Sequence, residues 1–150
     1  MKVIRSLAAL TLLFAASNAF AADKVCKLEI AGTDQMSFDK KELVVAPDCT
    51  SVELTLKHTG KLPAQAMGHN WVLTKTADVA GVANDGMGAG LPKQYLKDGD
   101  ARVIAHTKVI GGGQSDTIKF PISKLTKGGA YTFFCSFPGH SSMMKGTLKF

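Results

Sequence analysis

Apolar and polar residues alternate along much of the chain, in runs short enough to be β-strands. The clearest run covers residues 52–57, where a valine and two leucines alternate with glutamate, threonine and lysine. This alternation is typical of a strand with one buried and one solvated face. Similar segments, separated by turn residues such as the three consecutive glycines at 111–113, predict further strands at 27–30, 42–45, 70–73, 102–110, 117–120, 131–135 and 146–150.

Many short strands with frequent turns predict an all-β fold, an antiparallel β-sandwich. Residues 131–135 and 146–150 flank one loop and are expected to pair as neighbours. The segment 76–90 breaks the pattern: Asp78 is a candidate N-cap for a helix through Val79 and Val82, although three glycines weaken that helix. We therefore expect one short helix in an excursion outside the sandwich.

The first 21 residues have the features of an export signal. Lys2 and Arg5 precede an apolar run at 7–16 that is too short to span a bilayer, and Ala19-Phe20-Ala21 is a typical cleavage site. A retained membrane anchor is the weaker alternative. The sequence thus predicts a signal peptide at 1–21, a single domain at 22–150 and a soluble periplasmic product without a membrane span.

The net charge and the cysteine content narrow the range of possible functions further. The formal charge of +6 falls to +4 without the signal, and the lysines are scattered, which favours solubility and weak steering towards acidic partners over nucleic-acid binding. An oxidising compartment favours a disulfide between Cys26 and Cys49. Cys135 is then a lone thiol exposed to oxidation, and metal ligation best explains its presence.

The segment 135–146 concentrates candidate metal ligands. Cys135, His140, Met143 and Met144 lie within ten positions, and thiolate, thioether and imidazole together suit copper. A second imidazole would complete a His₂Cys centre with a weak axial methionine. His69 is the best candidate, because strand alternation places it on the same side as Trp71 and Leu73, at one end of the core. His58 and His106 are expected to be ordinary packed or surface side chains.

Three motifs, at 67–73, 102–108 and 133–140, resemble the azurins, a family of bacterial blue-copper proteins with a Greek-key cupredoxin fold. The resemblance extends over essentially the whole mature chain. It implies one copper ion held by His69, Cys135 and His140, with Met144 as the weak axial ligand and the Gly68 carbonyl opposite. Met143 competes for the axial role. It also implies that Asn70 ties the two ligand-bearing segments together.

The same resemblance implies a monomeric one-electron carrier without enzymatic activity. Partners of such carriers include c-type cytochromes and copper- or haem-containing reductases and oxidases, and His58 would be a buried histidine whose protonation tunes the reduction potential. Electrons would pass through the His140 ring edge, surrounded by an apolar patch. The residues that match this patch are Met36, Leu62, Ala66, Met67, Met87, Phe137, Pro138, Gly139 and Met143.

Three other functions use overlapping residues. A thiol enzyme would employ Cys135 as nucleophile with a histidine as base. A periplasmic copper chaperone or buffer would share the soft ligands but would need to release the metal readily. A structural zinc site would require four close ligands, and a methionine ligand argues against it.

Overall fold

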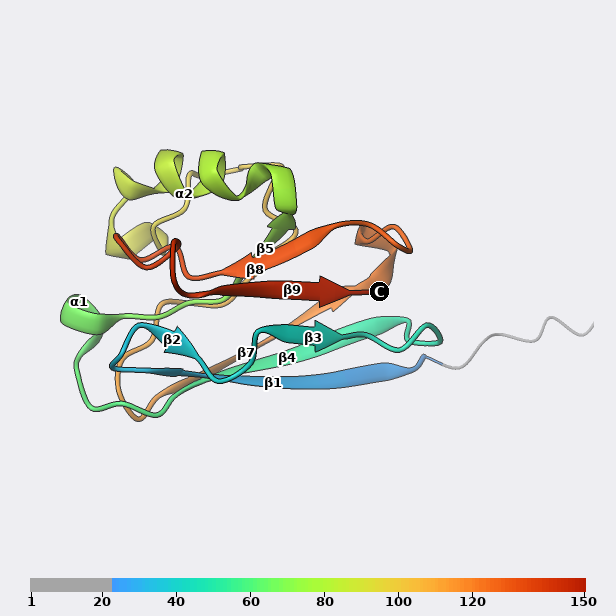
Figure 1. Cartoon of the computed structure of the whole chain (residues 1–150), viewed down its shortest axis with the longest axis horizontal. Helices are drawn as coiled ribbons and strands as arrows, with labels where there is room; N and C mark the ends of the chain where they lie inside the picture. The colour runs from blue at the N-terminus through green and yellow to red at the C-terminus, as the bar shows by residue number, and fades with distance from the viewer. Residues whose placement is uncertain (1–22) are drawn as a thin grey trace, which may run out of the picture.

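The computed structural model describes residues 23–150, and the predicted signal peptide at 1–21 lies outside the described residues. Nine strands form a four-stranded sheet in the order β2-β1-β4-β7 and a five-stranded sheet in the order β3-β9-β8-β5-β6 (Figure 1). The strands are β1 (Val25–Thr33), β2 (Ser37–Phe38), β3 (Glu42–Val44), β4 (Ser51–His58), β5 (Val72–Lys75), β6 (Ala105–His106), β7 (Ser115–Pro121), β8 (Tyr131–Phe134) and β9 (Lys145–Lys149). The predicted all-β sandwich is confirmed.

Two strand pairs correct the expectation of a purely antiparallel sandwich. β1 pairs with β4 in parallel, and β3 pairs with β9 in parallel, while the other pairs are antiparallel. The β1–β4 pair is parallel because the chain passes through β2, crosses to the other sheet as β3 and returns as β4. A disulfide joins Cys26 in β1 to Cys49, two residues before β4, so the predicted bridge is confirmed.

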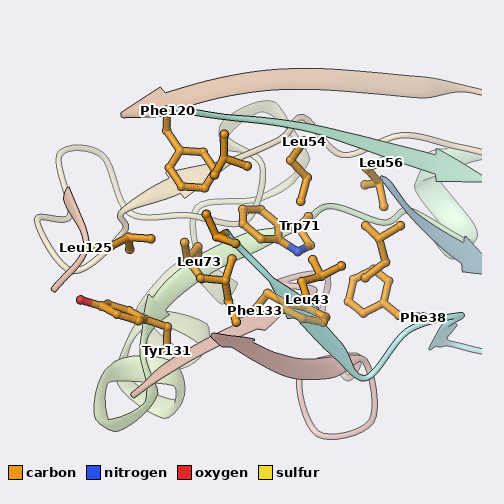
Figure 2. Close-up of a cluster of buried hydrophobic side chains, with 14 of the residues drawn as sticks. Phe38, Leu43, Leu54, Leu56, Trp71, Leu73, Phe120, Leu125, Tyr131 and Phe133 are labelled. Atoms are coloured by element: carbon orange, nitrogen blue, oxygen red, sulfur yellow. The ribbon is translucent and has the colours of Figure 1, made fainter. Parts of the chain in front are cut away.

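The core lies between the two sheets. Figure 2 shows Trp71 between Leu54 of β4 and Phe133 of β8, and the Trp71 ring stacks on Phe120 and Phe133 with centroids 6.1 and 6.0 Å apart. Trp71 and Leu73 are fully buried, as the alternation predicts. Burial of such side chains supplies the main drive for folding.

The predicted excursion is present as helix α2 (Val79–Met87), entered through a 3₁₀ turn at Thr76–Asp78. Val82 and Ala83 of α2 pack with Val72 and Phe134 on the outer face of the five-stranded sheet. Asp78 occupies the N-cap position, as predicted, but its side chain makes no capping bond. A four-residue helix, α1 (Ala64–Met67), and 3₁₀ turns at Leu91–Lys93 and Ile122–Lys124 were not predicted.

The strand predicted at 102–110 shrinks to the two residues of β6. Around β6, several backbone N–H groups donate to side chains instead of to backbone carbonyls. Thr107 Oγ1 accepts the Trp71 N–H at 2.9 Å, and Asp116 accepts the Lys108 N–H at 2.8 Å. The Val109 N–H donates to the side-chain oxygen of Gln94. These side-chain bonds interrupt the regular ladder, so only β6 counts as a strand, although backbone bonds from Ile104 to Leu73 and between Ile110 and His69 keep the segment beside β5. Among residues 23–150, no helix has the length and apolar character needed to cross a membrane.

Candidate metal centre

His69, Cys135 and His140 converge at one end of the sandwich. β5 and β8 pair antiparallel with Val72 opposite Phe134, so the residues just before β5 and just after β8 meet at the same sheet end. Cys135 Sγ lies 4.0 Å from His69 Nδ1 and 3.7 Å from His140 Nδ1. The three ligand atoms lie within 4.8 Å of one another, and all three residues are buried. The expectation that His69 meets Cys135 is confirmed.

The hydrogen bond of His69 fixes which ring nitrogen is available. Its Nε2–H donates to the Thr33 carbonyl at 2.8 Å, which leaves the Nδ1 lone pair facing Cys135. Burial lowers the pKa of His69 below its ordinary value, so the ring stays neutral. A neutral imidazole held by its remote N–H is the form that ligates metals.

Burial sets the protonation of the other two ligands. It raises the pKa of the Cys135 thiol to about 12, and the backbone of Asn70 and Phe137 opposes this effect only partly. Burial, followed by the charge of His69, lowers the pKa of His140 to about 4. At neutral pH the metal-free site therefore contains two neutral imidazoles and one protonated thiol. A metal cation would displace the thiol proton.

These shifts predict how the stability of the metal-free protein depends on pH. Because folding depresses the pKa of His140 from 6.5, its contribution is complete above pH 6.5 and is lost as the pH falls towards 4. Because folding raises the pKa of Cys135 from 9.0, its contribution is complete below pH 9 and is lost as the pH rises towards 12. We expect a plateau of urea midpoints between these limits.

Urea titrations at half-unit pH intervals test this plateau. His106→Asn is the matched control, because His106 is exposed and should leave the acid limb unchanged. A midpoint that stays flat from pH 6.5 down to 4.5 in the metal-free natural chain would contradict the acid limb.

A buried polar frame joins the segments that carry His69 and Cys135. Asn70 donates through Nδ2 to Ser136 Oγ at 2.8 Å and to the Gln94 carbonyl at 3.0 Å. The Ser136 N–H donates to Asn70 Oδ1 at 2.8 Å, and Ser136 Oγ donates to the same Gln94 carbonyl at 2.9 Å. The structure thus contains the connection implied for Asn70 by the resemblance. It orients the neighbouring ligands His69 and Cys135 by joining the segments that carry them.

The two adjacent methionines have opposite environments. Met144 is fully buried, whereas Met143 is 57% exposed. A Cβ placed on Gly32 would lie 2.7 Å from the His69 ring and 3.4 Å from the Met144 methyl, so the Met144 side chain and the His69 ring pack against the same backbone position. The Gly68 carbonyl lies 3.9 Å from Cys135 Sγ. Met144 and Gly68 therefore adjoin the three-ligand cluster, and Met143 faces solvent.

The donor set fits copper better than other common metals. It combines one thiolate sulfur, two imidazole nitrogens and an adjacent thioether, which are soft or borderline ligands without a carboxylate. A model of copper-binding proteins of the plastocyanin/azurin family matches residues 24–150. The chain belongs to this family. Its membership confirms the family predicted from the sequence, copper as the cofactor, and the function of a blue-copper electron carrier.

Named relatives place the chain close to the azurins. It is 63% identical to azurin of Bordetella pertussis over 124 residues, covering 83% of both chains. It is 58% identical to azurin of Pseudomonas chlororaphis over 123 residues, covering 82% of this chain and 96% of that one. A solved azurin (Az-iso2) structure from Methylomonas sp. strain J matches with a TM-score of 0.80 and 45% identity, covering 83% of this chain and 96% of that chain.

The residues predicted to form the apolar patch are all at least partly exposed. Leu62, Met87 and Met143 are three of the four large apolar side chains that are exposed among the described residues. Ala66, Pro138 and Gly139 are exposed, and Met36, Met67 and Phe137 are half-buried. In Figure 1, α1, the C-terminal end of α2 and the loop between β8 and β9 lie at the same end of the molecule. The ring of Phe137 contacts His140 at a centroid distance of 4.6 Å.

The two remaining histidines differ in environment. His58 is buried, and its ring stacks on His69 with centroids 4.4 Å apart. Its Nδ1 accepts the Gly60 N–H and its Nε2 therefore donates to the Met67 carbonyl, which describes a neutral ring. The coupling of His58 protonation to the potential stays a prediction. His106 is exposed on β6, opposite Val72, and does not belong to the ligand cluster, as expected.

Sequence reasoning missed four residues around the centre. Gly32 and Thr33 pack against or hydrogen-bond His69, and Ser136 and Gln94 complete the polar frame. Ser136 was visible as the polar neighbour of Cys135. Thr33 acts through its main-chain carbonyl, which leaves no mark in the residue type. Gln94 acts through its carbonyl and through a side-chain bond to Val109, 15 residues away, which no local sequence signal identifies.

Proposed function

We propose that the protein carries single electrons between periplasmic redox proteins through a copper centre held by His69, Cys135 and His140, with Met144 as the weak axial ligand and the Gly68 carbonyl opposite. The observation that supports this most directly is the convergence of one buried thiol and two neutral imidazoles within 4.8 Å. Bound copper would supply the one-electron chemistry by cycling between Cu(II) and Cu(I).

The protein's own residues would limit rearrangement and solvent access. The Thr33 carbonyl fixes the His69 ring, and Asn70 fixes the spacing of the His69 and Cys135 segments. All three proposed equatorial ligands are nearly or fully buried, so solvent reorganisation at the centre is small. Electrons would pass through the His140 ring, which contacts Phe137 and lies in the loop that carries the exposed Pro138 and Gly139.

Titration with Cu(II) tests this function. The purified protein should take up one copper per chain and develop an intense blue colour that a reductant bleaches reversibly. A colourless complex, or a blue one that cannot be reduced and reoxidised, would contradict the carrier function. Zinc binding in preference to copper would favour a structural site instead.

The rival functions fit the site less well. A nucleophilic cysteine needs an accessible thiolate, whereas Cys135 is fully buried and its thiol pKa is raised to about 12. A copper chaperone must release its metal readily, whereas these ligands are buried and held by hydrogen bonds on three segments. We therefore favour a carrier over an enzyme or a chaperone.

The axial assignment predicts different effects for the two methionines. Met144→Leu removes one electron-pair donor, which destabilises Cu(II) more than Cu(I). We expect the reduction potential to rise by about 60 mV or more, equivalent to a tenfold change in the relative stability of the oxidation states. Met143→Leu should leave it unchanged, because that side chain is exposed. Protein-film voltammetry of both variants measures this, and equal shifts would contradict the assignment.

The apolar patch is proposed as the docking surface for redox partners, which include c-type cytochromes and copper- or haem-containing reductases and oxidases. Transient redox interfaces are small, below about 1,200 Å². A monomer with one such patch around His140 would suit brief encounters.

A charge within the patch should slow exchange without altering the copper centre. We expect Met67→Glu to reduce the electron self-exchange rate by roughly tenfold, because two copies of the patch would then repel, while the visible spectrum stays unchanged. Val44→Glu is the matched control. Val44 is also exposed, at 59%, but it lies on β3 opposite Lys149 and is not one of the patch residues. Equal rates in Met67→Glu and the natural chain would argue against docking at this patch.

A further inference from the structure

Gln94 occupies an unusual position between the three segments that surround the metal centre. Its carbonyl accepts hydrogen bonds from Asn70 Nδ2 at 3.0 Å and from Ser136 Oγ at 2.9 Å. Its side-chain Oε1 accepts the N–H of Val109, whose neighbour Ile110 bridges to His69 through two backbone bonds of 3.0 and 2.8 Å. One residue therefore connects the His69 segment, the Cys135 segment and the segment after β6.

The backbone of Gln94 is in a conformation that glycine would adopt more readily. Its φ is +59°, and the next residue, Tyr95, has a φ of +51°. Two consecutive left-handed residues with large side chains are uncommon, and such conformations persist where the surroundings fix them. Here the α2 helix fixes them: a Cβ on Gly86 would lie 2.1 Å from the Tyr95 carbonyl oxygen. The loop is held from behind by a tightly packed helix.

The dipeptide Gln94-Tyr95 also contacts the loop that carries His140. The Tyr95 ring contacts Phe137 edge-on at 5.1 Å, and Phe137 contacts the His140 ring at 4.6 Å. Gln94 thus acts on the frame of His69 and Cys135, while Tyr95 acts on the loop that carries His140. The main-chain direction at Gln94 sets both contacts at once.

We propose that Gln94 is a positioning residue of the copper centre, whose side-chain bond to Val109 holds its carbonyl in place as the shared acceptor of Asn70 and Ser136. This inference rests on the proposed function, because it assumes that His69, Cys135 and His140 hold the metal. Gln94 itself touches none of these ligands. It acts through Asn70 and Ser136, whose hydrogen bonds orient the ligand-bearing segments.

Two substitutions at Gln94 separate the side-chain bond from side-chain size. Gln94→Met keeps an unbranched chain of similar length but removes the acceptor, whereas Gln94→Glu keeps an oxygen that accepts the Val109 N–H. Gln94→Gly also removes the acceptor while favouring the positive φ, so it carries the same test if Gln94→Met does not fold. The matched control is Gln114→Met, because Gln114 Oε1 accepts the nearby Gly111 N–H at 2.8 Å, a bond of the same kind that involves neither Asn70 nor Ser136.

Three readouts distinguish positioning from simple stabilisation. In the copper-free protein, amide hydrogen exchange at Ser136 should become faster in Gln94→Met. Copper affinity should fall roughly tenfold, at the low end of what the loss of a ligand-orienting partner costs. In the copper-loaded protein, the visible band should shift. Gln94→Glu should behave as the natural chain in all three, and Gln114→Met should change only the unfolding midpoint.

The opposite pattern overturns the inference. If Gln94→Met and Gln114→Met lower the unfolding midpoint equally while Ser136 exchange, copper affinity and spectrum stay as in the natural chain, Gln94 has only a structural role. A failure of the proposed function would look different, since the natural chain itself would then not form a blue, reducible complex.

Discussion

Cys135→Ser should abolish the intense blue colour completely. The hydroxyl of serine is a hard, weakly acidic group that stays protonated at the buried position, whereas thiolate sulfur is the soft ligand on which the copper–sulfur absorption depends. We also expect copper affinity to fall by at least about two orders of magnitude. Of the three residues in the described cluster, Cys135 is the one that would bind the metal as an anion. Absorption spectroscopy and a competition titration with a chelator measure the two effects.

The matched control for this variant is Ser142→Ala, an exposed hydroxyl in the same loop that bonds only the Gly139 carbonyl at 3.4 Å. It should remain blue with unchanged copper affinity. The circular dichroism of copper-free Cys135→Ser should match that of the natural chain, since sulfur and oxygen differ little in size. A blue band of ordinary intensity in Cys135→Ser would refute the assignment of this residue as a ligand.

Removing the disulfide should have the largest effect on stability with the least effect on colour. The double substitution Cys26→Ala and Cys49→Ala opens a bridge between residues 23 apart in sequence. In the chain-entropy model, a ring of this size stabilises the fold by roughly 3 kcal/mol. We expect a corresponding loss in the free energy of unfolding by urea, with the visible spectrum of the copper form preserved.

The spectrum should survive because the bridge and the ligands lie at opposite ends of the sandwich. Cys26 lies near the start of β1, whereas His69 hydrogen-bonds the last residue of that strand, Thr33. Ser51→Ala, at the disulfide end of β4, is the matched control and should change stability by no more than about 0.5 kcal/mol. A changed blue band, or an unchanged urea midpoint in the double variant, would contradict this separation.

The sequence predicted the metal cluster because most of its determinants are local. Cys135, His140 and Met144 are read directly from one loop, and the flanking strands β8 and β9 pair as their apolar patterns suggest. Only His69 comes from a distant segment; its alternation with Trp71 suggested its orientation, and the resemblance to the azurins supplied its role as a ligand. Adjacent positions alone do not separate Met143 from Met144, but the resemblance to the azurins favours Met144, and the burial of Met144 and exposure of Met143 agree with it.

Other features were beyond the sequence for identifiable physical reasons. The parallel pairing of β1 with β4 joins segments 26 residues apart, and strand patterns do not encode direction. The segment around β6 has a strand-like pattern, yet the Thr107 and Asp116 side chains replace some of its backbone partners, so only two residues form a regular strand. The left-handed backbone at Gln94 could not be predicted, because the residue there is not a glycine. Each case depends on a contact between distant segments that local preference does not specify.

The hydrogen bond from His69 to a main-chain oxygen also determines which substitutions the metal centre tolerates. Any amino acid at position 33 presents the same carbonyl to His69 Nε2, so the tautomer that exposes Nδ1 survives mutation there. The preceding residue has no such freedom, since even one methyl group on Gly32 would collide with the imidazole. Substitutions at these two neighbouring positions should therefore differ: those at position 33 keep the contact with His69, whereas any side chain at position 32 displaces the His69 ring.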